Sequence, residues 1–154
     1  MRLRAAASAD GATLLAWAND PGTRQASGNR PPVEWDHHRD WLAGRLGHPG
    51  TLFLIGESAA GQAVGSIRFE TRDDWRTAVL SYVVAPEARG QGFGRALLVE
   101  GVSVLRRRYP SVRIEASVAE DNVASRRLFG NLGWDGETGE AGRIRFVDQG
   151  GAAA

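Results

Sequence analysis

Hydrophobic residues gather in short runs along the chain, and glycine, proline and polar turns separate these runs. Runs rich in β-branched and aromatic residues predict strands, because such residues pack well on a pleated sheet. Strands are expected over residues 2–5, 51–57, 63–70, 78–84 and 111–118, with two more near Trp134 and over 143–147. Apolar and polar residues alternate from 111 to 118, which predicts a strand with one buried face. Residues 51–57 and 63–70 are expected to form a hairpin.

Helical periodicity indicates four helices between these strands. The first is expected to begin after a cap at Ser8 or Asp10 and to end at about Asn19. The other three are expected over residues 36–46, 93–108 and 122–132. The apolar stripe of the third helix contains Phe93, Leu97, Gly101, Val104 and Leu105. Residues 19–35 are rich in Gly, Pro and Asn and predict a long loop, and residues 73–76 predict a polar turn. This order of elements predicts an α/β (α+β) protein, a mixed sheet with helices on its faces.

Size and composition limit the classes of function. The 154 residues predict a single domain over 1–149 and a flexible tail over 150–154. With 19 basic and 18 acidic residues the net charge is +1, so we expect neither nucleic acid nor a membrane as partner. The chain contains no cysteine, which excludes disulfides and fits the cytoplasm. No metal is expected, since the adjacent His37 and His38 point to different sides of a helix.

Residues 80–96 join a strand to a helix through a glycine-rich loop. Pro86 cannot donate to a sheet and ends the strand, and Gly90, Gly92 and Gly94 follow at alternate positions. Glycine allows the backbone to take positive φ and to approach a ligand closely. The first amides of the following helix are unpaired and lie at the positive end of its dipole. The loop therefore predicts a phosphate or pyrophosphate site.

Two common phosphate-binding loops do not fit this segment. The Walker pattern requires Lys and then Ser or Thr after the last glycine, whereas Arg95 and Ala96 follow Gly94. The dinucleotide fingerprint requires a glycine three residues after the second one, where Arg95 stands. The pattern that remains is Arg89-x-x-Gly92-x-Gly94.

A second motif follows one helix and one strand later. It reads Asn122-Val-Ala-Ser125-Arg-Arg-Leu128-Phe129-Gly-Asn-Leu-Gly133-Trp134, an Asn-capped helix with apolar residues on one side. The two motifs and their spacing resemble the GCN5-related N-acetyltransferase (GNAT) family. Its signatures are Gln/Arg-x-x-Gly-x-Gly/Ala and Asn-x-x-Ala/Ser-x-x-Leu-Tyr/Phe-x-x-x-Gly-Phe. The resemblance implies a mostly antiparallel central sheet, splayed between its fourth and fifth strands, and acetyl-CoA as co-substrate.

The resemblance also implies roles for residues around acetyl-CoA. Backbone groups of Tyr82, Val83 and Val84 would line the acetyl and pantetheine arm at the splay. The pyrophosphate would bind the loop that contains Arg89, Gly90, Gln91, Gly92, Phe93, Gly94 and Arg95. Asn122 would hydrogen-bond the pantetheine arm, with Ser125 in support.

The implied reaction is direct attack of an amine on the acetyl carbonyl, and a base must accept the ammonium proton. The candidate bases are Glu115, Glu70 and Ser117. Glu115 and Ser117 share the polar face of their strand, and relatives often place Glu where Ser117 stands. Phe129 stands where many relatives have Tyr, so either Tyr82 or water protonates the leaving thiolate, or the thiolate leaves unprotonated.

Upstream residues carry a second resemblance, to acetyltransferases that modify the 4-amino group of UDP-linked amino sugars in pseudaminic-acid biosynthesis. These residues are Asn19-Asp20-Pro21, Arg24, Ser27, His38-x-x-Trp41 and Gly65-x-x-Arg68-Phe69. Arg24 and Arg68 would meet a nucleotide diphosphate, and Trp41 or Trp35 would stack on a base or sugar.

Other acceptors stay open at this point. They are protein N-termini, small amines and antibiotics, and a non-catalytic acyl-CoA-binding module is a further alternative. A binding module would lack a carboxylate near the acetyl group. We expect a small-molecule amine as acceptor and a monomer or homodimer as the active form.

Overall fold

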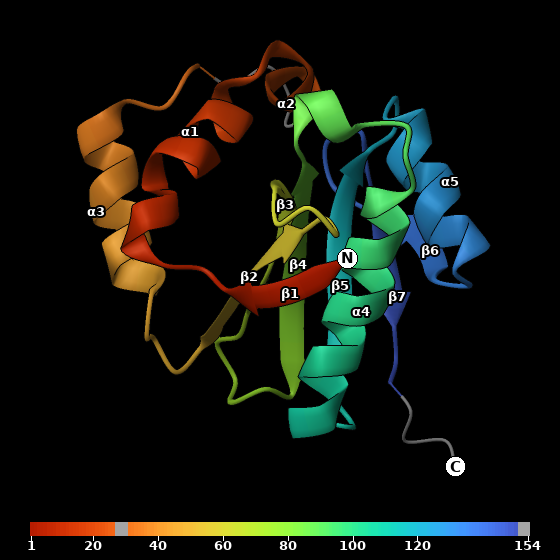
Figure 1. Cartoon of the computed structure of the whole chain (residues 1–154). Helices are drawn as coiled ribbons and strands as arrows, with labels where there is room; N and C mark the ends of the chain where they lie inside the picture. The colour runs from red at the N-terminus through yellow and green to blue at the C-terminus, as the bar shows by residue number, and fades with distance from the viewer. Residues whose placement is uncertain (27–30, 151–154) are drawn as a thin grey trace.

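The structure is a computed structural model that describes residues 1–26 and 31–150. Expectations for residues 27–30 of the predicted loop and 151–154 of the tail lie outside the described residues. A seven-stranded sheet forms the centre, in the order β1-β2-β3-β4-β5-β7-β6 (Figure 1). Its strands are β1 (Arg2–Ala5), β2 (Thr51–Glu57), β3 (Ala63–Glu70), β4 (Thr77–Val84), β5 (Arg113–Ala119), β6 (Asp135–Thr138) and β7 (Arg143–Asp148).

Neighbouring strands run antiparallel except for β4 and β5, which run parallel. This parallel pairing is short: Thr77–Val79 pair with Arg113–Glu115, and the two strands separate beyond these residues. The observed sheet confirms the predicted mixed, mostly antiparallel architecture with a splay between the fourth and fifth strands.

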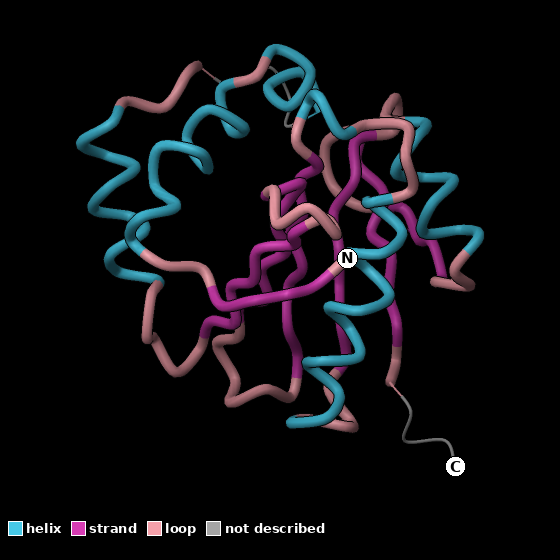
Figure 2. The backbone as a smooth tube through the Cα atoms, in the orientation of Figure 1, coloured by secondary structure: helices cyan, strands magenta, loops and turns pink. Residues whose placement is uncertain are grey.

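Helices cover both faces of the sheet, as the tube in Figure 2 shows. They are α1 (Gly11–Asn19), α2 (Pro21–Ala26), α3 (Trp35–Arg45), α4 (Phe93–Arg108) and α5 (Val123–Asn131), with two short 3-10 helices, η1 (Ser8–Asp10) and η2 (Pro86–Ala88). On β2, Leu54 packs in one core with Leu97 of α4, whereas Ile55 packs in the other with Leu42 of α3. No described helix is long and apolar enough to cross a membrane.

The predicted apolar patterns correspond to the buried positions. On α4, the buried residues are Leu97, Leu98, Gly101 and Leu105, so the predicted stripe is correct at its centre. On β5, Ile114, Ala116 and Val118 are buried and Ser117 is exposed, as the alternation predicts.

The prediction of one continuous loop over residues 19–35 is wrong, because α2 forms within it. Pro21 is the first residue of α2, where a missing amide proton costs nothing. Asp20 precedes it, and its Oδ2 accepts a hydrogen bond from the Thr23 amide at 3.2 Å. The sequence therefore contains an N-terminal capping signal that the high Gly and Pro content obscures.

The predicted polar turn at residues 73–76 contains a core residue. Trp75 is 8% exposed, and its ring stacks on that of Tyr109 with centroids 4.8 Å apart. Its indole Nε1 donates to the Pro49 carbonyl at 3.1 Å. Neither partner is close in sequence, so local pattern alone misses this burial.

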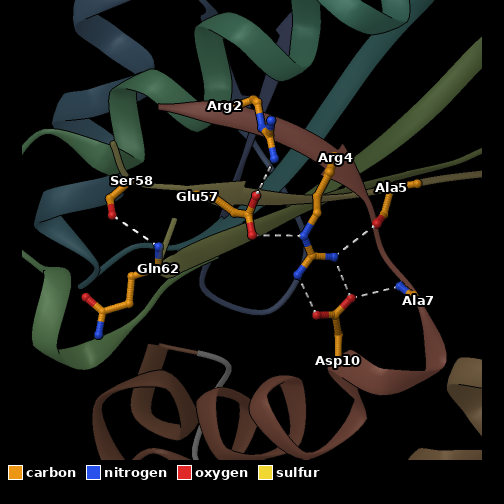
Figure 3. A network of polar contacts seen from close by, with 8 residues as sticks. All are labelled: Arg2, Arg4, Ala5, Ala7, Asp10, Glu57, Ser58 and Gln62. Carbon is orange, nitrogen blue, oxygen red and sulfur yellow. Dashed lines mark hydrogen bonds and ion pairs between the residues drawn. The ribbon is translucent and has the colours of Figure 1, made fainter. Parts of the chain in front are cut away.

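An ion-pair network joins β1 to η1, directly before α1 (Figure 3). Arg4 donates to both carboxylate oxygens of Asp10, at 2.9 and 2.8 Å, and its Nε lies 3.1 Å from Glu57 Oε2. The Arg4 guanidinium holds the pKa of the Asp10 carboxyl below its usual value. The network fixes the start of α1 relative to the sheet. Helix α1 in turn forms part of the cleft described below.

Two glycines provide a test of the packing. An ideal Cβ at Gly65 would lie 2.5 Å from the Val83 carbonyl oxygen and 2.7 Å from Leu97 Cδ1, so we expect Gly65→Ala to cost about 1–3 kcal/mol. Gly44, exposed on α3, has no heavy atom within 4 Å of its Cβ position, so Gly44→Ala should stabilise by about 0.5–1 kcal/mol. Urea denaturation measures both, and an unchanged stability of Gly65→Ala would contradict the packing.

Candidate active site

A cleft of about 1250 Å³ opens where the β4–β5 pairing ends. The sheet contributes residues of β3, β4 and β5 to its wall, including Tyr82 and Ser117. Helices α1, α2 and α3 contribute one side, and the glycine-rich loop and α5 contribute the other. We call the part of the cleft at the loop and α5, where acetyl-CoA is predicted to bind, the cofactor half, and the part under α1, α2 and α3 the acceptor half.

The glycine-rich loop has the backbone geometry that the sequence predicts. Gly90 and Gly92 have φ values of 75° and 86°, in the left-handed region that favours glycine. Gly92 is the N-cap of α4, so the unpaired amides of the first turn of α4 follow it directly. An ideal Cβ at either glycine meets no heavy atom within 4 Å, so there is free space in front of the loop. These features fit a bound pyrophosphate.

Strand β4 and helix α5 form the side of the cofactor half where the pantetheine arm is predicted to lie. Tyr82 and Ser125 hydroxyls lie 2.6 Å apart, which ties the two elements together. Asn122 caps α5, since its Oδ1 accepts from the Ser125 amide at 3.2 Å. Burial raises the pKa of the Tyr82 phenol, so this group stays protonated at neutral pH and can donate a proton. Val83, Val84, Phe93, Gly94 and Arg95 also line the cleft.

The side chains of two residues of the predicted pyrophosphate loop form contacts with other parts of the protein. The Arg89 guanidinium turns toward α2, where its Nη2 donates to Asp20 Oδ2 at 2.9 Å and to Thr23 Oγ1 at 3.0 Å. Gln91 donates to the Glu87 carbonyl at 3.3 Å and does not line the cleft. Arg89 thus joins the cofactor loop to the acceptor half, and its predicted role at the pyrophosphate stays a prediction.

The three candidate bases differ in whether they line the cleft. Ser117 lines the cleft. Glu115 pairs with Arg113 at 3.0 Å, and Glu70 pairs with Arg68 at 2.6 Å and Arg45 at 3.3 Å. Neither carboxylate is among the lining residues, so a catalytic role for either one stays a prediction.

The predicted acceptor residues meet in the acceptor half. Arg24, Trp41 and Arg68 all line the cleft, and the Arg68 guanidinium lies 4.7 Å from the centroid of the Trp41 ring. Arg24 Nε donates to the Ala18 carbonyl at 2.7 Å, which fixes its side chain beside α1. Trp35, the alternative stacking residue, is 46% exposed and is not a lining residue.

Sequence reasoning missed two residues of the cleft. Arg143 of β7 donates to Ser117 Oγ at 2.6 Å and to its carbonyl at 2.9 Å. The pairing of β5 with β7 brings it there, and no local motif contains it. The sequence assigns His38 no site role of its own beyond the motif His38-x-x-Trp41, yet it is 5% exposed and lines the cleft. Its spacing of three residues from Trp41 was the available signal, since both then lie on one helix face.

Comparisons with known proteins agree with this geometry. Residues 1–135 match the model of the family described as "Acetyltransferase (GNAT) domain". The chain therefore belongs to the GNAT family of acetyltransferases, and it is an acetyl-CoA-dependent N-acetyltransferase. The non-catalytic alternative is thereby set aside. A search of curated protein sequences gave no match.

Solved structures share the whole fold. A ribosomal-protein-alanine N-acetyltransferase from Brucella melitensis is 27% identical, with a TM-score of 0.77 over 96% of this chain and 97% of that one. The Salmonella typhimurium protein yncA, solved with acetyl-CoA, is 26% identical, with a TM-score of 0.76 over 96% and 91%. Spermidine N-acetyltransferase from Vibrio cholerae, solved with CoA and spermine, is 18% identical, with a TM-score of 0.82 over 95% and 92%.

Substitution of Gly92 tests the cofactor loop. Gly92→Asp places a Cβ and a negative charge at the helix N-terminus where we expect the pyrophosphate, whereas Gly92→Asn has a similar size and tolerates left-handed φ. We expect Gly92→Asp to weaken acetyl-CoA binding more than tenfold relative to Gly92→Asn, measured by calorimetry on folded protein. Equal affinities of the two variants would show that no phosphate binds at this loop.

The burial of His38 predicts a pH-dependent stability. Burial lowers the pKa of the folded-state imidazole below its ordinary 6.5, so protonation favours the unfolded chain. The free energy of unfolding should therefore be unaffected by this group above pH 6.5, the ordinary pKa of the unfolded chain. Below that pH it should decrease, by at most about 1.4 kcal/mol per pH unit for one proton. Urea denaturation between pH 7.5 and 5.5 measures the slope. His38→Gln should flatten it and His48→Gln, on an exposed histidine, should not; a parent slope kept by His38→Gln would contradict the assignment.

Proposed function

We infer that the acceptor is a primary amine on a molecule that also carries an anionic group, and that an amino group of a UDP-linked amino sugar is the leading candidate. The observation that carries this proposal is the charge of the cleft wall. Its described lining residues include six arginines and no aspartate or glutamate: Arg24, Arg68, Arg89, Arg95, Arg127 and Arg143.

The acceptor half has the groups that a nucleotide sugar requires. Arg24 and Arg68 offer planar guanidinium groups, which bind phosphate oxygens at two points. Trp41 offers an aromatic surface beside them. The nearest acidic groups are already paired, Glu70 with Arg68 and Asp20 with Arg89. A diphosphate would therefore enter a wall whose net charge is positive.

The same wall favours an amine that loses its proton easily. A nearby positive charge disfavours the ammonium form and lowers its pKa, which increases the fraction of attacking amine. Backbone amides that face the gap between β4 and β5 are available to the developing oxyanion. The departing thiolate takes its proton either from the protonated Tyr82 hydroxyl or from water. This chemistry suits an amine of low pKa better than a polyamine.

A protein N-terminus is the second candidate acceptor. The Brucella melitensis ribosomal-protein-alanine N-acetyltransferase supports it, at 27% identity over the full fold. An α-amino group has a pKa near 8, well below that of a lysine at about 10.4, so it also fits the cationic wall.

We further propose that the enzyme acts in the cytoplasm on a small-molecule acceptor, without nucleic acid, as a monomer or homodimer. The lack of cysteine supports the cytoplasm, and the balanced charge supports the absence of nucleic acid.

A thiol-release assay with acetyl-CoA tests the acceptor class directly. The panel contains UDP-linked amino sugars, N-terminal peptides, aminoglycosides and spermidine. We expect a UDP-linked amino sugar to give the highest kcat/KM, because it combines a primary amine with a diphosphate. Faster turnover of spermidine than of every UDP-linked amino sugar would overturn the proposal.

Arg68 provides the residue-level test. Arg68→Ala should raise KM for the sugar nucleotide by about 10–150-fold, equivalent to about 1.5–3 kcal/mol for hydrogen bonds to a charged group. Arg68→Lys keeps the charge and loses the planar fork, so we expect an intermediate KM. Acetyl-CoA affinity should not change. Arg39→Ala on the outer surface of α3 is the matched control, and thermal unfolding confirms that each variant is folded. An unchanged KM for Arg68→Ala would contradict the role.

A further inference from the structure

The register of the sheet determines which residues face each other at the narrow end of the gap between β4 and β5. Val79 and Glu115 are the last paired residues of these strands. Alternate residues of a strand share one face, so Ser81 and Ser117 lie on the same face as this pair, on opposite sides of the gap. Both line the cleft. Tyr82, whose backbone is predicted to line the acetyl group, follows Ser81 directly, so we expect the reacting amine at this narrow end.

The side chain of Arg143 is held at this end of the gap by Ser117. Its Nε donates to Ser117 Oγ at 2.6 Å, and its Nη2 donates to the Ser117 carbonyl at 2.9 Å. A guanidinium carries five N–H groups, and these two contacts use one edge of it. The edge formed by Nη1 and Nη2 keeps two parallel N–H groups, the arrangement that binds a carboxylate or a phosphate at two points. Arg143 lines the cleft, so this edge is available to a molecule within it.

The charge of Arg143 is not neutralised, whereas its arginine neighbours on this part of the sheet are paired. Arg113 pairs with Glu115 at 3.0 Å, and Arg145 pairs with Glu137 at 3.2 Å. Arg143 forms no ion pair with any carboxylate of residues 1–26 and 31–150. It is therefore a cation with a fixed position, a free fork of donors and no counter-charge from the described chain.

We propose that Arg143 binds an oxyanion of the acceptor, a carboxylate or a phosphate, close to the amine that is acetylated. The proposal rests on the proposed function and deepens it, because it adds a specificity-determining residue to the site for an anionic acceptor. Arg68 pairs with Ser81 across β3 and β4, so it lies on the other side of the gap from Arg143. The acceptor is thus held by one arginine on each side of its reacting amine.

Ser117 suits this role because its side chain is neutral. It fixes the guanidinium through two hydrogen bonds and leaves the positive charge available to the acceptor. A carboxylate at this position would form an ion pair with Arg143 and cancel its attraction for an anion. A cation near the amine also disfavours the ammonium form, and an oxyanion on the same molecule offsets the repulsion that an ammonium would meet on entry.

Matched pairs of acceptors that differ in charge test the proposal in a thiol-release assay with acetyl-CoA. The carboxylate arm compares amino acids with their carboxamides. The phosphate arm compares phosphoethanolamine with ethanolamine, and UDP-linked amino sugars with the free amino sugars. Expressing kcat/KM per unprotonated amine removes differences in amine pKa. We expect the charged member to be preferred in at least one arm, which identifies the oxyanion. No preference in either arm would overturn the proposal.

Variants of Arg143 assign the preference to this side chain. Arg143→Gln should raise KM for the charged member by about 10–150-fold and leave both KM for the neutral member and acetyl-CoA affinity unchanged. Arg143→Lys keeps the charge and loses the planar fork, so we expect an intermediate KM. Arg145→Gln is the matched control, because Arg145 lies two residues further along β7, is exposed and is not a lining residue. It should keep the parent preference, and thermal unfolding shows which variants are folded.

This proposal and the proposed function fail in different ways. If UDP-linked amino sugars are poor acceptors, that assignment fails, but a preference for another charged acceptor that is lost in Arg143→Gln supports the oxyanion site. The site is ruled out if Arg143→Gln keeps the parent KM for the charged member or raises KM equally for both members. An equal effect of Arg145→Gln would also rule it out, because it would indicate only long-range attraction. If Arg143→Gln does not fold, Arg143→Lys decides, and a parent KM in that variant overturns the proposal.

Discussion

The parallel pairing of β4 with β5 ends after three residue pairs, and the rest of the active site depends on this early separation. Each strand keeps its other neighbour, β3 for β4 and β7 for β5, so the sheet continues on both sides of the gap. Backbone amides and carbonyls that face the gap have no strand partner, and buried groups of this kind need one. A ligand that runs along the gap can provide it. The sheet thus creates a site of fixed width without using any particular side chain.

The elements around the gap are fixed by a few polar contacts. Tyr82 and Ser125 join β4 to α5 on the cofactor side. Arg89 joins the glycine-rich loop to Asp20, which itself caps α2 on the acceptor side. An exposed ion pair alone adds little stability, but this one shares Asp20 with a helix cap and a second acceptor, Thr23. The position of the acceptor wall is therefore linked to the glycine-rich loop, where the cofactor pyrophosphate is predicted to bind.

Local patterns in the sequence predicted much of this fold and the backbone geometry of the glycine-rich loop. The alternation of Ile114, Ala116 and Val118 marked a buried strand face, and the glycines before α4 marked a loop whose geometry needs positive φ at Gly92. Both signals are local, because they depend on a residue and its near neighbours. In the acceptor half, the resemblance indicated Arg24, Trp41 and Arg68, which line the cleft, but local patterns could not predict the ion pairs around them. The charges there depend on contacts between strands and helices far apart in sequence, such as Glu70 with Arg45.

Those distant contacts change the chemistry that the residues suggest when taken singly. Glu70 and Glu115 are the kind of residue that serves as a base, yet arginines neutralise both outside the cleft wall. A histidine is an unremarkable helix residue by pattern, yet burial beside Trp41 makes His38 a neutral group at the site. A cationic wall lowers the pKa of a bound amine and so raises the fraction of the amine that is free to attack. The lack of carboxylates among the described lining residues is therefore consistent with acetyl transfer to an anionic acceptor.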